Sequence, residues 1–268
     1  MKLKKILAVA LLAVSAMGFQ IANAQSLSPS TKWHWDKGTI VIDTPERPAS
    51  QEHVLGLTAA PVKTVRIGFV GLGMRGPSAV IRFCQIPGVE IVALCDYEEK
   101  RAEAQQRHLR NAGLAPAAIY YGEKGYEELC KRPDVDLIYI ATDWNHHFPV
   151  AKCAMENGKH AAIEVPSAMN LEQCWNLIDL SEKTRLHCFI LENCCYDDYE
   201  MKSLLMAQDG VFGEVIRAEG AYIHELSEFW KYYWKDPNDN DKDNLHWRMK
   251  YNLSLIHISE PTRPEPIS

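Results

Sequence analysis

Short apolar runs alternate with longer amphipathic segments over most of this chain. Apolar runs of β-like composition cover residues 65–70, 89–95, 136–142, 160–164 and 186–191. Between them, the spacing of apolar residues predicts helices over residues 98–111, 148–157 and 171–183. This alternation predicts the α/β fold class, with a Rossmann-type, doubly wound parallel sheet.

A glycine-rich turn follows the first apolar run. Gly71, Gly73 and Gly76 have the spacing GxGxxG, and the second run ends at Asp96, about 20 residues further on. Strand, glycine turn, helix, strand and acidic residue together are the fingerprint of dinucleotide binding. The glycines allow a close approach to a pyrophosphate, which the helix N-terminus attracts. Because Asp96 accepts hydrogen bonds from a ribose diol and repels a 2′-phosphate, the fingerprint predicts NAD rather than NADP.

Further polar residues follow the other predicted strands. In doubly wound sheets, ligands bind beyond the carboxyl ends of the strands. Besides the glycine turn and Asp96, these ends carry residues 142–147, residues 164–166 and Asn193. We therefore expect these segments to line the same site.

Net charge and cysteine spacing exclude several classes of partner. The formal net charge is −6, and it falls to about −9 if residues 1–24, which contain Lys2, Lys4 and Lys5, are removed. This balance argues against nucleic acid or an anionic membrane surface as a partner. The eight cysteines show no CxxC or zinc-ligand spacing. We predict free thiols, several of them on apolar runs (Cys84, Cys95, Cys153, Cys174 and Cys188), and no metal site.

The N-terminus has the three parts of a secretory signal peptide. Residues 2–5 are basic, residues 6–19 are apolar, and Ala22-Asn23-Ala24 forms a cleavage site. The apolar part is too short to cross a bilayer comfortably, which disfavours the alternative of an uncleaved anchor. The sequence thus predicts an exported protein, periplasmic or secreted, with no stable membrane span after cleavage.

The C-terminus has a different character. Residues 253–263 resemble the translation of a sequencing-library adapter, and a natural proline-rich tail is the alternative. On this interpretation the natural sequence continues beyond Asn252. The predicted parts are a signal peptide (1–24), a leader segment (25–63), an NAD-binding Rossmann domain (64–193), the truncated start of an α+β substrate domain (194–252) and the adapter-derived tail (253–268). A β-like run over residues 214–224 would open the sheet of the second domain.

Several short motifs resemble a known family. They are Gly-Met-Arg-Gly at 73–76, Trp-Asn-His-His at 144–147, Glu-Val-Pro at 164–166, Glu-Asn at 192–193 and Ala-Tyr-Ile-His-Glu-Leu at 221–226. In this order they resemble glycoside hydrolase family 109, within the glucose–fructose oxidoreductase, inositol dehydrogenase and rhizopine-catabolism (Gfo/Idh/MocA) superfamily. The resemblance covers roughly residues 57–249. It implies an NAD-dependent α-N-acetylgalactosaminidase acting on a small glycoside by transient oxidation at C3, elimination and water addition.

One position separates this activity from that of the sugar dehydrogenases of the superfamily. Their strand-end motif is Glu-Lys-Pro, whose lysine moves the proton of the oxidised hydroxyl, whereas Val165 stands at the middle position here. Valine carries no proton, and losing an acid/base step costs about 10²–10⁴-fold in rate. The resemblance therefore favours the hydrolase. A sugar or polyol oxidoreductase and an inactive NAD-binding fragment remain the alternatives.

The resemblance also assigns roles by matched position. Beside the three glycines, it implies cofactor contacts from Met74, Arg75, Asp96, Trp144, Asn145, His146, His147, Glu164, Val165 and Asn193. It implies substrate contacts from Tyr222 and Arg248. The family's catalytic Tyr-Pro-Thr-His segment does not occur in this sequence. The catalytic residues therefore stay unassigned, and the sequence leaves the oligomeric state open.

Overall fold

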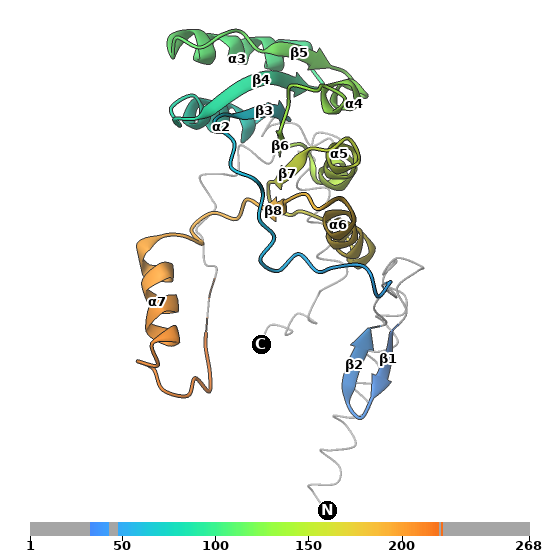
Figure 1. Cartoon of the computed structure of the whole chain (residues 1–268), viewed down its shortest axis with the longest axis vertical. Helices are drawn as coiled ribbons and strands as arrows, with labels where there is room; N and C mark the ends of the chain where they lie inside the picture. The colour runs from blue at the N-terminus through green and yellow to red at the C-terminus, as the bar shows by residue number, and fades with distance from the viewer. Residues whose placement is uncertain (1–32, 43–47, 220, 222–268) are drawn as a thin grey trace, which may run out of the picture. The chain divides into compact units, whose positions relative to one another are not determined.

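The computed structural model describes residues 33–42, 48–219 and 221 (Figure 1). The predicted signal peptide, the predicted tail, Tyr222 and Arg248 lie outside these residues. All the described helices and strands belong to one unit, Ser30–Val215. Within the described residues, no helix combines the length and apolarity needed to cross a membrane.

A parallel sheet of six strands confirms the predicted fold class. Its spatial order is β5-β4-β3-β6-β7-β8. The strands are β3 (Val65–Val70), β4 (Val89–Asp96), β5 (Ala118–Tyr121), β6 (Leu137–Ile140), β7 (His160–Ile163) and β8 (Cys188–Ile190). Val70, the last residue of β3, pairs with Cys95 on one side and with Ile140 on the other, so three strands end at the same level. Strand order reverses between β3 and β6, which is where doubly wound sheets bind ligands.

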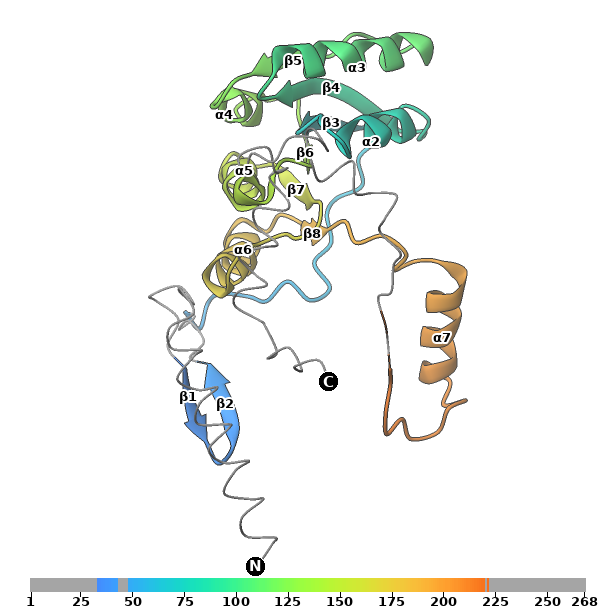
Figure 2. The same ribbon diagram turned by 180° about the vertical axis from the view of Figure 1, so that it is seen from behind.

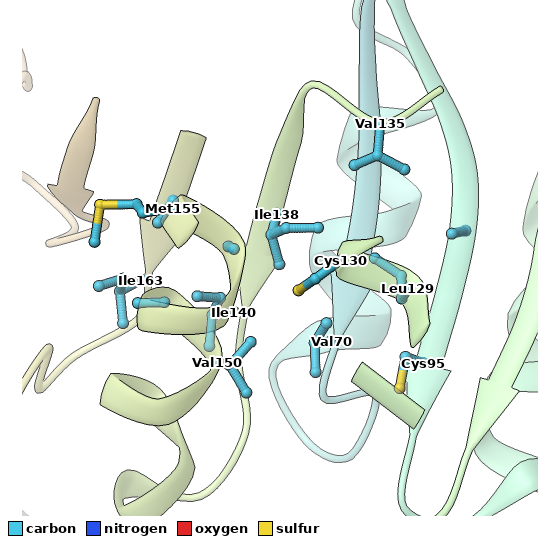
Figure 3. Packing of buried hydrophobic residues seen from close by; sticks show 14 of the residues in the cluster. Val70, Cys95, Leu129, Cys130, Val135, Ile138, Ile140, Val150, Met155 and Ile163 are labelled. Atoms are coloured by element: carbon cyan, nitrogen blue, oxygen red, sulfur yellow. The ribbon is translucent and has the colours of Figure 1, made fainter. Parts of the chain in front are cut away.

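Helices cover both faces of this sheet (Figures 1 and 2). The helices are α2 (Gly76–Phe83), α3 (Glu99–Asn111), α4 (Gly125–Cys130), α5 (Trp144–Glu156) and α6 (Leu171–Thr184). On one face, residues of α4, α5 and α6 pack with Ile138 and Ile140 (Figure 3). On the other face, residues of α2 and α3 pack with Phe69 and Tyr139. Neighbouring residues of β6 thus face opposite cores, as the period of two in a strand requires.

Helix α5 begins four residues earlier than the sequence predicts. Asp143 is its N-cap, and the Asp143 carboxylate accepts a hydrogen bond from the backbone N–H of Asn145. This cap stabilises a first turn that contains residues 144–147. Pro149 lies inside the helix, so it does not mark the start.

The hairpin β1–β2 and helix α7 were among the elements that the sequence did not predict. In the predicted leader, β1 (Trp33–Asp36) and β2 (Thr39–Ile42) form an antiparallel hairpin. Its two-residue turn, Lys37-Gly38, has positive φ at both positions, as a type I′ turn requires. Helix α7 (Asp198–Gln208) follows β8.

The later part of the leader packs against α6. The Gln51 side-chain amide donates to Glu182 at 2.7 Å and to Asp179 at 3.1 Å. Arg185, which ends α6, donates to the backbone oxygen of Glu52 at 2.8 Å. These hydrogen bonds attach the leader to the sheet-bearing unit ahead of β3.

The predicted β-like run over residues 214–224 is only partly within the described residues. Its described stretch 214–219 contains no strand, and the rest lies mainly outside. All eight cysteines are within the described residues, and none is in a disulfide. Cys95 and Cys130 are buried. Cys174 is exposed, although its place on an apolar run predicted a buried thiol.

Candidate functional site

The three glycines of the turn differ in how closely other atoms approach them. Gly71 has a φ of +94°, and a Cβ there would lie 2.5 Å from Thr142 N and closer still to the Ala141 carbonyl. A Cβ on Gly76 would overlap Gly71 O. At Gly73, apart from the glycine and its two chain neighbours, the only atom of the described residues within 4 Å of a Cβ would be Arg101 Nη1, at 3.7 Å. The first and third glycines thus permit close packing of the chain on itself, and the second leaves an open face that suits a pyrophosphate.

Asp96, predicted to bind the ribose, lies directly beside this turn. Its side chain is 5% exposed. Oδ2 accepts a 2.6 Å hydrogen bond from Leu72 N, and Oδ1 accepts one of 3.0 Å from Glu98 N. A carboxylate has about four acceptor positions, so two remain for a diol. The position of Asp96 therefore suits the predicted role, and the same carboxylate also holds the glycine turn against β4.

Arg75 and Glu164 come together although they are far apart in the sequence. Arg75 Nε donates to Glu164 Oε1 at 3.2 Å. The hydroxyl of Tyr139 donates to the same oxygen at 2.5 Å, and burial together with the Glu164 carboxylate raises the Tyr139 pKa. Tyr139 was not predicted as part of the site. The available signal was a tyrosine in a buried strand, whose hydroxyl needs a hydrogen-bond partner.

The first turn of α5 presents one exposed histidine and buries the next. His146 is exposed, and its Nδ1 lies 2.6 Å from Asp143 Oδ2. His147 is 1% exposed. Its Nδ1 lies 2.6 Å from Pro166 O, and its Nε2 lies 3.1 Å from Thr142 O. His147 thus joins the segments that follow β6 and β7, and the cofactor contact that the resemblance implies for it stays a prediction.

Four more of the predicted cofactor residues are accessible. Val165 directly follows Glu164 and is 38% exposed. Met74 is exposed on the glycine turn, and Trp144 is half-buried at the start of α5. Asn193 is exposed beyond β8. All four follow strand ends of the sheet, as predicted.

The described residues contain no cluster of three or more histidine, cysteine, aspartate or glutamate side chains that could hold a metal ion. What the site offers is an open glycine turn, a ribose acceptor and the paired Arg75 and Glu164. Such groups suit a dinucleotide. The side chain at position 165 is a valine, which cannot carry a proton.

Comparisons with known proteins agree with the Rossmann fold. Residues 65–191 match a family model described as "Oxidoreductase family, NAD-binding Rossmann fold". The chain is 76% identical, over 94% of its own length, to glycosyl hydrolase family 109 protein 3 of Phocaeicola vulgatus, of which it covers 46%. It is 63% identical, again over 94% of its length, to protein 4 of that family in the same organism, of which it covers 49%. The chain therefore spans about half the length of the curated relatives it matches.

A solved structure shares the fold. The crystal structure of myo-inositol dehydrogenase from Lactobacillus casei, in complex with NAD(H) and myo-inositol, aligns with a TM-score of 0.50 and 23% identity. The alignment covers 56% of this chain and 43% of that one. At this identity the likeness concerns the Rossmann fold only.

Proposed function

We propose that the whole protein is an NAD-dependent glycosidase. Residues 65–191 match the family model of the Gfo/Idh/MocA superfamily, and the chain's curated relatives are named glycosyl hydrolase family 109. Its proposed substrates are small α-N-acetylgalactosaminides. The observation that carries the proposal is the end of β7. There Glu164 is fixed by two donors, and the next side chain, exposed Val165, cannot carry a proton.

In this proposal the cofactor contacts come from residues of the glycine turn and the neighbouring strand ends. The open face of Gly73 receives the pyrophosphate, and Asp96 accepts hydrogen bonds from the adenosine ribose. Arg75 and Glu164 border the other end of the turn, toward β7. When bound, the nicotinamide supplies reversible hydride acceptance at C3 of the sugar, which makes the C2 proton acidic and allows the C1 aglycone to leave.

A net sugar oxidoreductase is the second candidate, because the superfamily and the fold are shared with dehydrogenases. Val165 argues against it. Net alcohol oxidation must remove the hydroxyl proton permanently, and a valine side chain has no group to accept it. In the proposed hydrolysis the C3 hydroxyl is restored in each turnover, so the cycle has no net proton or hydride to export.

The test is an assay of the full-length protein with p-nitrophenyl α-N-acetylgalactosaminide and NAD. We expect release of p-nitrophenol without accumulation of NADH. In deuterated water, deuterium should appear at C2 of the released sugar, because elimination removes that proton. Steady NADH production in proportion to sugar consumed would support the oxidoreductase. Hydrolysis without deuterium at C2 would indicate direct displacement at C1.

A further inference from the structure

Arg101 places a cation at the mouth of the glycine turn. It lies in the first turn of α3 and is 48% exposed. Its Nη2 lies 2.8 Å from Glu98 Oε1, and its Nη1 lies 3.6 Å from Asp96 Oδ1. The sequence fingerprint does not include this position.

The same nitrogen also borders the open face of Gly73. Arg101 Nη1 would be 3.7 Å from a Cβ on Gly73, and within the described part of the chain no other atom beyond the neighbouring residues lies within 4 Å of that point. The guanidinium therefore lies between the predicted pyrophosphate position and the predicted ribose acceptor, Asp96. A dinucleotide that uses both must pass along it.

We propose that Arg101 binds the ribose–phosphate part of the adenosine half, and that it narrows the preference for NAD over NADP that Asp96 creates. This proposal rests on the dinucleotide site of the proposed function. Asp96 alone disfavours a 2′-phosphate by like charge. A guanidinium 3.6 Å from that carboxylate offsets its charge, and its planar set of donors matches phosphate oxygens.

The present partners of Arg101 leave it free to make this contact. Its shorter ion pair is with Glu98, and both side chains are about half exposed. Exposed ion pairs of this kind contribute little to stability, so exchanging Glu98 for a phosphate costs little. Asp96 keeps its hydrogen bonds from Leu72 N and Glu98 N when the guanidinium moves.

The experiment is calorimetric titration of NAD and of NADP into the 268-residue chain and three variants. Arg101→Gln removes the charge but keeps a long side chain suited to a helix, and Arg101→Lys keeps the charge without the planar donors. Lys100→Ala is the matched control, since it removes one positive charge from an exposed neighbour in the same turn. Thermal unfolding without nucleotide is measured for each variant.

We expect Arg101→Gln to weaken NADP binding about 10- to 100-fold, as loss of a charge-assisted hydrogen bond does. NAD binding should weaken less, about 3- to 5-fold, so that the ratio of the two dissociation constants rises. For Arg101→Lys the ratio should lie between those of the parent chain and Arg101→Gln. Lys100→Ala should change both affinities by less than about twofold. Because the ratio is taken within one variant, a partial loss of folded protein does not alter it.

Two results would overturn the proposal. One is an unchanged ratio in Arg101→Gln, whether or not both affinities fall. The other is a rise in this ratio for Lys100→Ala as large as the rise for Arg101→Gln, which would indicate a general charge effect. If the unmodified chain binds NAD but the ratio is unchanged, only the role of Arg101 fails. If it binds neither nucleotide, the cofactor assignment of the proposed function fails as well.

Discussion

At the scale of single residues, Tyr139 fixes the position of Glu164. Its ring stacks on Phe69 with centroids 4.9 Å apart, and its hydroxyl reaches Glu164 Oε1 at 2.5 Å. Tyr139→Phe keeps the ring packing and removes this donor. We expect a loss of about 1.5–3 kcal/mol in the free energy of unfolding, typical for a hydrogen bond to a charged group. NAD affinity should also fall.

Urea denaturation and calorimetric titration measure both effects. Tyr121→Phe is the control, because Tyr121 is exposed and its change should stay within about 0.5 kcal/mol. Unchanged stability and NAD affinity in Tyr139→Phe would show that Glu164 is held by Arg75 alone.

The buried His147 and the half-buried His160 should make stability depend on pH. Burial lowers the pKa of His147, although its hydrogen bonds to the Pro166 and Thr142 carbonyls oppose this shift. Burial and the neighbouring His187 lower the pKa of His160. Because both pKa values are below the ordinary 6.5, the unfolded chain takes up more protons as the pH falls below 6.5. We predict that the free energy of unfolding falls from pH 7 to pH 5.5.

Denaturation by urea at several pH values checks this prediction. His147→Gln should flatten this dependence. A stability that stays constant or rises toward pH 5.5 would contradict the proposed cause.

Sequence patterns located some site residues and missed others for physical reasons. Asp96 was predictable because its distance from the glycines is fixed by the strand–helix–strand unit. The pairing of Arg75 with Glu164 depends on the order of strands in the sheet, which no local pattern contains. Arg101 and Tyr139 lie on a polar helix and in an apolar strand, where their residue types are ordinary. Their importance comes only from what the fold places beside them.

At the scale of elements, one glycine of the turn is needed for folding and another for nucleotide binding. We predict that Gly71→Ala destabilises the protein by at least about 2 kcal/mol, because its φ is +94° and its Cβ would meet the β6–α5 backbone. Gly73→Ala should stay within about 1 kcal/mol of the parent protein. It should nevertheless weaken NAD binding at least about tenfold, because the methyl group occupies the open face.

Thermal unfolding and NAD titration of the two variants test this separation. The two glycines are two residues apart in one turn, so each variant is the control for the other. Full NAD affinity in Gly73→Ala would show that the pyrophosphate does not lie on that face.

Long apolar runs predicted elements well, and short or half-polar ones did not. Strand β3 has the predicted bounds, and β4 extends one residue further. Strand β5 and helix α4 were missed, because four and six residues carry too little periodicity. The hairpin β1–β2 was missed because its strands lie in a segment interpreted as polar. Helix α5 was started too late although Asp143, its N-cap, is a residue type that marks helix starts in a sequence.

At the scale of the whole molecule, nucleotide binding and folding are linked. A ligand that binds only the folded chain stabilises it by about 2.7 kcal/mol at 100 times its dissociation constant. We predict this increase for NAD with the 268-residue chain, and little increase for Gly73→Ala at the same concentration. Denaturation curves with and without NAD provide the measurement, with nicotinamide alone as the control. Equal stabilisation of Gly73→Ala would contradict the assigned site.

The glycine turn is anchored to neighbouring strands without any ligand. Gly71 N donates to Cys95 O at 2.9 Å, Leu72 N donates to Asp96, and Gly71 packs on the Ala141 backbone. A turn held at these points has few dihedral angles left to restrict when a nucleotide arrives. Association should therefore be a single encounter, whose observed rate rises linearly with nucleotide concentration and shows no plateau from slow loop closure.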